Sequence, residues 1–149
     1  MRNTLIASLL CCVVNLLACG QSDGAHWIRS TSKTSTSVKD IFKVYLEHGI
    51  SGVSGEVLDC YDKAYKSAPS VKRQRQVQHC ISIDWAGYQL DSWASAALKT
   101  TNIPYFHEDA LNERVRAFLP LSGLTEKEVE DLTFAIDDLL KSEINEANK

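Results

Sequence analysis

Two aspartates, Asp84 and Asp91, have the type and spacing that could carry chemistry. They are seven residues apart in a stretch of helical periodicity, with Tyr88 between them. They therefore lie on one face of a helix, about 10 Å from each other. Paired carboxylates perform general acid–base hydrolysis, and inverting glycosidases hold theirs roughly 6.5–9.5 Å apart. Arg114 and Arg116 are the expected partners if the aspartates are structural instead. The sequence favours the structural role, and a small hydrolase is the alternative.

The histidines and cysteines give no metal, haem or nucleophile motif. The four histidines have none of the short spacings of a zinc site: they are His26, His48, His79 and His107. The chain also lacks a haem-attachment motif, a glycine-rich phosphate loop and a nucleophile elbow. We therefore expect no metal and no cofactor.

Cys60 and Cys80 are expected to form a disulfide between two neighbouring helices. They are the only cysteines after residue 37 and are 20 residues apart. Closing a loop of about 20 residues stabilises a fold by roughly 3 kcal/mol in the chain-entropy model. A disulfide implies an exported protein, because a cytosolic chain would keep both thiols reduced.

Charge is unevenly distributed. The formal net charge of −3 argues against general nucleic-acid binding. Five cations surround one predicted turn: Lys63, Lys66, Lys72, Arg73 and Arg75. They form a candidate contact for phospholipid headgroups, lipopolysaccharide phosphates or an acidic protein. The alternative is that the turn is simply solvated. The last helix is acidic and is a candidate partner face, with Glu126, Glu128, Glu130, Asp131, Asp137, Asp138, Glu143 and Glu146.

Trp85 and Trp93 are expected to anchor the core. They are eight residues apart, with Tyr88 between them. If they lined a cleft instead, the ligand would be small and apolar.

The helical periodicity of the sequence predicts an all-α domain of about five helices with one interhelical disulfide. Periodicity of three and four is longest in residues 77–98, where Cys80, Ile83, Ala86, Leu90, Trp93, Ala94 and Ala97 share one side. The expected helices are 38–48 (N-cap Ser37), 55–67 (N-cap Ser54), 70–98, 107–119 (closed by Pro120 and Gly123) and a last helix that follows a capping box of Thr125 and Glu128.

The N-terminus has the pattern of an export signal. Arg2 precedes an apolar stretch, residues 5–17, which is too short to span a bilayer. The stretch ends in Leu16-Leu17-Ala18-Cys19-Gly20, which resembles the lipobox of bacterial lipoproteins and implies cleavage before Cys19 and its acylation. The alternative is ordinary signal cleavage after the small-x-small site that ends at Gly20. The expected organisation is a signal and lipidation site at 1–19, a Ser/Thr-rich tether at 20–37 and a helical domain at 38–149.

These observations favour a non-enzymatic lipoprotein of the bacterial envelope, with its domain in the periplasm, that binds another envelope or secreted protein. It would be an accessory of an envelope or secretion complex, or an immunity or inhibitor protein. The alternatives are a periplasmic hydrolase that uses Asp84 and Asp91 and a carrier of an apolar ligand. A soluble periplasmic or secreted form is the alternative location.

Overall fold

The computed structural model describes residues 23–149, and side-chain surroundings from residue 33 onward. Lys33–Lys149 form a compact unit of their own, which begins slightly before the domain start predicted at Val38. The predicted signal sequence and Cys19 lie outside the described residues.

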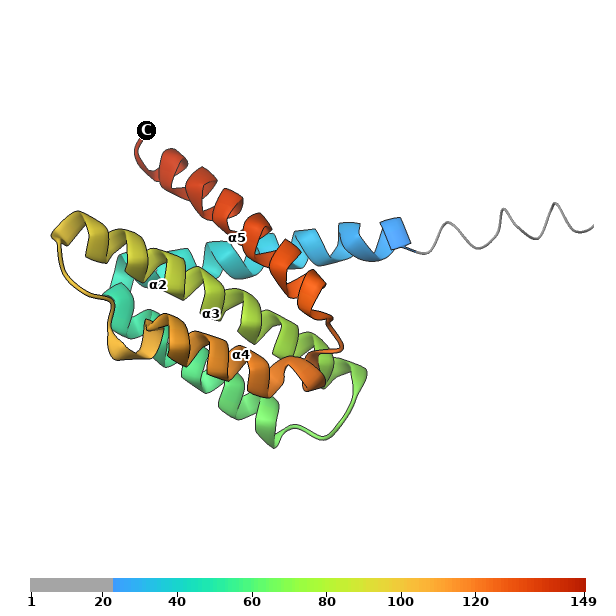
Figure 1. Cartoon of the computed structure of the whole chain (residues 1–149). Helices are drawn as coiled ribbons and strands as arrows, with labels where there is room; N and C mark the ends of the chain where they lie inside the picture. Colours follow the sequence, from blue (N-terminus) through green and yellow to red (C-terminus); the bar gives the residue numbers. More distant parts are fainter. Residues whose placement is uncertain (1–22) are drawn as a thin grey trace, which may run out of the picture. The chain divides into compact units, whose positions relative to one another are not determined.

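Residues 23–149 contain four α-helices and one short 3₁₀-helix (Figure 1): α2 (Asp23–Lys66), α3 (Val71–Leu98), η1 (Pro104–Phe106), α4 (Glu108–Ser122) and α5 (Glu126–Ala147). The predicted all-α class is confirmed for these residues, which form no strand. The number of helices is four and not about five. Within the same residues, no helix combines the length and apolar character needed to cross a lipid bilayer.

The two helices predicted on either side of residues 50–54 are halves of α2. Gly49 has φ 66° and ψ −167°, outside the helical region, and the chain resumes its helix at once. Glycine adopts a positive φ without the steric cost of a Cβ, so α2 bends here without a loop. Ser54 is therefore no N-cap, and its Oγ donates to the carbonyl of Ser51 at 3.0 Å within the helix.

The predicted start of the first helix at Val38 is also wrong. Helix α2 begins at Asp23, inside the stretch predicted as a Ser/Thr-rich tether. Ser37 is 6% exposed and its Oγ donates to the Lys33 carbonyl at 2.9 Å. Hydroxyl side chains can bond the carbonyl four residues earlier, and this lets a Ser/Thr-rich sequence remain helical when the hydroxyls face a core.

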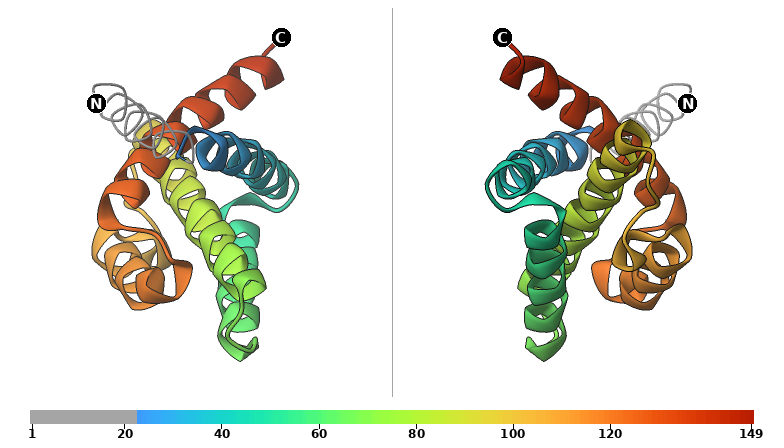
Figure 2. Two further views of the ribbon diagram at one scale, coloured as in Figure 1. Left: turned by 90° about the vertical axis from the view of Figure 1, so that its right-hand side faces the viewer. Right: turned by 90° about the vertical axis from the view of Figure 1, so that its left-hand side faces the viewer.

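Helix α3 is the central element of the unit. Figures 1 and 2 show it between the C-terminal half of α2 and α4, with α5 crossing it. Ser70 caps its N-terminus by accepting from the Arg73 amide, close to the predicted start. The predicted apolar stripe is buried at Cys80, Ile83, Ala86 and Leu90 and becomes progressively exposed toward the C-terminal end, at Trp93, Ala94 and Ala97.

The predicted disulfide is present. The sulfurs of Cys60 and Cys80 are 2.05 Å apart, and their Cα atoms are 5.6 Å apart. The bond joins the C-terminal half of α2 to α3, and both residues lie in the hydrophobic core.

Helix α4 extends beyond its predicted end at Leu119. It continues through Pro120 to Ser122 and ends at Gly123, which has φ 70°. Proline removes the amide that would bond the carbonyl of Arg116, but both residues are exposed, so water can satisfy that carbonyl. The predicted capping box of α5 is confirmed: the Glu128 amide donates to Thr125 Oγ1 at 3.2 Å, and the Thr125 amide donates to Glu128 Oε2 at 2.8 Å.

Candidate functional site

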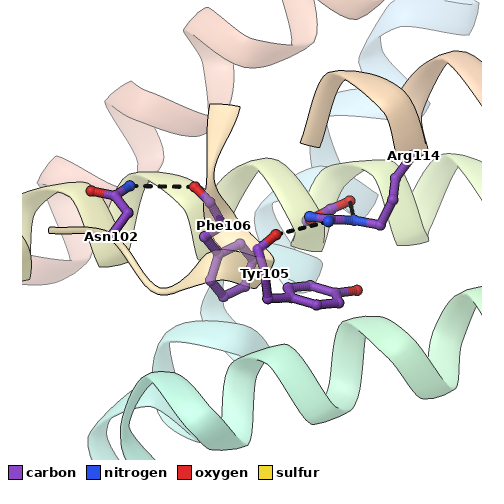
Figure 3. A network of polar contacts seen from close by, with 5 residues as sticks. Asn102, Tyr105, Phe106 and Arg114 are labelled. Carbon is purple, nitrogen blue, oxygen red and sulfur yellow. Dashed lines mark hydrogen bonds and ion pairs between the residues drawn. The ribbon is translucent and has the colours of Figure 1, made fainter. Parts of the chain in front are cut away.

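Asp84 is held in a buried ion pair with Arg114, one of the two partners expected from the sequence. Its side chain is 0% exposed, against 19% for that of Arg114. Arg114 Nε donates to Oδ2 at 3.0 Å, and Nη2 donates to Oδ1 at 2.7 Å. Arg114 Nη1 donates to the Tyr105 carbonyl at 2.7 Å, and the guanidinium carbon lies 3.9 Å from the centre of the Tyr105 ring (Figure 3). One arginine therefore joins α3, the segment before α4, and α4.

Burial dominates the electrostatics of this cluster. It raises the pKa of Asp84 from its ordinary value, and the hydrogen bonds and charge of Arg114 oppose that rise. Burial also raises the pKa of Tyr61, an effect that the nearby Asp84 charge strengthens, and it raises the pKa of Tyr105 to about 12. Both phenols therefore stay protonated at neutral pH.

Asp91 is held separately from Asp84, by the chain that follows α3. It is 3% exposed, and its Oδ2 accepts from the Ile103 amide at 2.9 Å. The neighbouring Asn102 donates from Nδ2 to Ser92 Oγ at 3.0 Å. The same Nδ2 donates to the Phe106 carbonyl at 3.3 Å (Figure 3). Each aspartate therefore already has a protein partner, Arg114 for Asp84 and the Ile103 amide for Asp91, and this arrangement fits the structural role that the sequence favours.

Gly87 lets two neighbouring elements approach the middle of α3. A Cβ at this position would lie 2.5 Å from Phe106 Cζ and 2.8 Å from Val53 Cγ1. Phe106 is fully buried and belongs to η1, and Val53 belongs to α2. The glycine therefore sets the distance of α2 and of η1 from α3.

A contact between Ser37 and His79 was not predicted. Ser37 Oγ lies 2.7 Å from His79 Nδ1 and joins α2 to α3. Because the Ser37 hydroxyl also donates to Lys33, the consistent arrangement is His79 Nδ1–H donating to Ser37 Oγ. The serine is thus not activated as a nucleophile. No local sequence signal links residues so far apart.

The five predicted cations divide into two groups. Lys63 pairs with Asp59, and Lys66 pairs with Asp62, each one turn away on α2. The other three, Lys72, Arg73 and Arg75, form no ion pair with any carboxylate in the described part of the chain. Lys72 and Arg75 are exposed, and Arg73 is half-buried.

The outer face of α5 combines acids with an exposed aromatic ring. Phe134 is 65% exposed. Glu130, Asp131 and Asp138 lie three or four residues from it, and so next to it on the helix. Within residues 33–149 these three acids form no ion pair. Phe134 does not share the apolar spacing of α5, and this sequence signal could have identified it.

An apolar groove lies between α2, α3 and the end of α5. Its volume is about 260 Å³, and its walls include Phe42, Tyr45, Leu46, Leu90, Trp93 and Ile144. Leu46 is 62% exposed, and Trp93 is half-buried. Trp85, on another side of α3, packs edge-to-face on Tyr88 and does not line the groove.

In the part of the chain that the structure describes, no three His, Cys, Asp or Glu residues converge as metal ligands. Comparison of the chain with protein-family models, with curated proteins and with solved structures finds no match.

Proposed function

We propose that this protein is a non-enzymatic, protein-binding domain that is held at the bacterial cell envelope by acyl chains on Cys19. The lipobox-like sequence supports the attachment, and the Cys60–Cys80 disulfide fits export to an oxidising compartment. Asp84 and Asp91, the residues best suited to acid–base chemistry, already have protein partners. The surface features that lack partners are better suited to recognition.

The exposed Phe134 among unpaired carboxylates is the observation that carries this proposal. Binding interfaces concentrate their energy in a few aromatic or arginine side chains, surrounded by charges that select and orient the partner. Phe134 supplies the aromatic anchor, and Glu130, Asp131 and Asp138 supply a negative surround. The complementary partner is an envelope or secreted protein with an apolar pocket bordered by Lys or Arg.

Site-specific photo-cross-linking in whole envelopes tests the binding face. p-Benzoylphenylalanine would replace Phe134 in the full chain, and the matched control would carry it at Leu58, which is 61% exposed on α2. We expect one discrete protein adduct from position 134, none from position 58, and loss of the adduct when Glu130, Asp131 and Asp138 are changed to Lys. Absence of an adduct at 134, or the same adducts from both positions, would overturn the proposed face.

The binding energy can be checked once the adduct is identified. Changing Phe134 to Ala should weaken the purified partner's binding by about 2 kcal/mol, or roughly 30-fold, as for an interface hot spot. An unchanged Kd would show that Phe134 is not the anchor.

The lipid attachment has its own test. Cells grown with labelled palmitate should yield a labelled protein, and Cys19→Ser should abolish the label. A Cys19→Ser chain that retains the label would contradict acylation at this residue.

The groove beside Trp93 favours a second candidate function, the carriage of a small apolar ligand. Its volume of about 260 Å³ is close to the lower end of ligand pockets, and its lining is predominantly apolar. Titration of a medium-chain fatty acid should shift the tryptophan emission of a Trp85→Phe chain and leave that of a Trp93→Phe chain unchanged. Equal responses from both chains would exclude this site.

A further inference from the structure

The turn between α2 and α3 forms a projecting end of the compact unit (Figure 2). We define the tip as residues 63–75, which comprise the last residues of α2, the turn and the first residues of α3. Two of its five cations are neutralised by carboxylates of α2, as described above. The other three, Lys72, Arg73 and Arg75, leave the start of α3 with an uncompensated positive charge.

Two of these three cations, Lys72 and Arg73, lie in the first turn of α3, where positive charge works against the helix. The first turn of α3 contains no acidic residue, although the N-terminus of a helix favours negative side chains and disfavours positive ones. Ser70 caps this helix start, but no carboxylate of the first turn offsets the positive charge, and a surface that binds negative charge would explain the arrangement.

The tip also exposes apolar surface beside these cations. Tyr65 is 70% exposed, and Val71 is 61% exposed, on either side of the turn. Val71 and Arg75 are four residues apart, and Lys72 and Arg75 are three apart, so these side chains share one face of α3. Exposed apolar and aromatic side chains among Lys and Arg are typical of surfaces that bind membranes at the headgroup level.

We propose that the tip docks on the surface of an anionic phospholipid bilayer. Lys72, Arg73 and Arg75 interact with headgroup phosphates, and Tyr65 and Val71 enter the headgroup boundary. A projecting end with mixed basic and apolar side chains complements a broad, negative, partly apolar surface. The inference rests on the proposed membrane attachment, which would keep the compact unit close to a bilayer surface.

Vesicle binding by the unacylated chain tests the tip independently of the anchor. Residues 20–149 lack the signal and the acylated cysteine but contain the whole compact unit. We expect this chain to cosediment with vesicles of phosphatidylglycerol and phosphatidylcholine, and not with vesicles of phosphatidylcholine alone. Binding should weaken as the salt concentration rises. Each unpaired cation should contribute roughly fivefold, so changing Lys72, Arg73 and Arg75 to Glu should lower the partition coefficient by roughly 100-fold or more.

The matched control changes Lys127, Lys141 and Lys149 of α5 and the C-terminus to Glu, which alters net charge equally. This chain should still bind, and circular dichroism should show that both variants remain helical. Equal binding to neutral and anionic vesicles, or equal losses in the two triple variants, would overturn the proposal. A Tyr65→Ser, Val71→Ser chain should bind several-fold more weakly, and unchanged binding would refute the apolar contact. Failure of the vesicle assay would leave acylation of Cys19 and binding by α5 intact, because neither uses the tip.

Discussion

Helix α3 is joined to α2 and to α4 by bonds of different kinds, and the comparison shows how this small unit is stabilised. On the α2 side, Cys60 and Cys80 form a covalent bond across 20 residues. On the α4 side, Asp84 and Arg114 form an ion pair across 30 residues. The disulfide persists in the unfolded chain and restricts it. The ion pair exists only after α4 has packed, so α4 depends on tertiary structure and α2 is held near α3 throughout.

Breaking the ion pair on one side should have the largest effect. Arg114→Leu leaves the buried Asp84 carboxylate without its partner, which should cost about 3–5 kcal/mol of unfolding free energy. Urea unfolding would measure it. The double change Asp84→Leu, Arg114→Leu is the control, because it removes both charges and should recover much of the loss. A cost below about 1 kcal/mol for Arg114→Leu would show that the pair is not desolvated.

Removing the disulfide should have the next largest effect. Cys60→Ala, Cys80→Ala should lower the unfolding free energy by about 3 kcal/mol, chiefly because the unfolded chain gains freedom. The measurement is urea unfolding with and without reductant. Reductant should destabilise the wild-type chain and have no effect on the double variant. If reductant left the unfolding free energy of the wild type unchanged, the Cys60–Cys80 disulfide would not be what stabilises the contact between α2 and α3.

Gly87 sharpens the comparison because α2 and η1 both contact it. Gly87→Ala should cost about 1–3 kcal/mol, since the new Cβ overlaps Phe106 and Val53. The matched control is Gly55→Ala on α2, where a Cβ meets nothing within 4 Å. That change should stabilise the chain by about 0.5–1 kcal/mol, as expected for an open helix position. Thermal unfolding of both variants should give shifts of opposite sign, and shifts of the same sign would contradict the close packing.

The Ser37–His79 contact gives the α2–α3 side a second, reversible bond with the smallest expected effect. Partial burial lowers the pKa of His79 in the folded chain. Below about pH 6.5 the unfolded chain therefore binds the proton more readily, and the unfolding free energy falls as the pH is lowered. The loss should be a few tenths of a kcal/mol, because the ring is still partly open to water.

A comparison of wild type with His79→Gln between pH 7 and pH 5 would measure this contribution. The unfolding free energy of His79→Gln relative to that of wild type should increase as the pH falls. Ser37→Ala retains the partly buried His79 ring, so its unfolding free energy should keep the pH dependence of the wild type. Parallel profiles for wild type and His79→Gln would rule the contribution out.

Sequence reasoning succeeded where the determining signal was local or where few pairings were possible. The capping box of Thr125 depends on residues within one turn, and Cys60 had a single available partner. Arg114 was one of two expected partners of Asp84, and the choice over Arg116 required knowing which face of α4 is inward. The position of Asp91 could not be predicted, because its partner is the backbone amide of Ile103 and any residue type supplies one.

The errors in helix boundaries have a physical cause. Ser37 and Pro120 are read as helix boundaries, yet both lie inside helices, whereas Gly49, which follows the expected end of the first helix, does interrupt the helical geometry of α2. Ser37 satisfies its hydroxyl within the helix, Gly49 changes direction at one residue, and Pro120 leaves a carbonyl that solvent can reach. At Ser37 and Pro120, packing or solvation outweighs the local preference, whereas at Gly49 the local preference of glycine for a positive φ is expressed.

The close approach at Gly87 constrains how this fold can diversify. Val53, Gly87 and Phe106 share one small volume, so a larger side chain at any of the three must be accompanied by a smaller one at another. Distant relatives of this chain should therefore show coordinated changes at these positions, and each could look unrelated when its residues are compared one at a time.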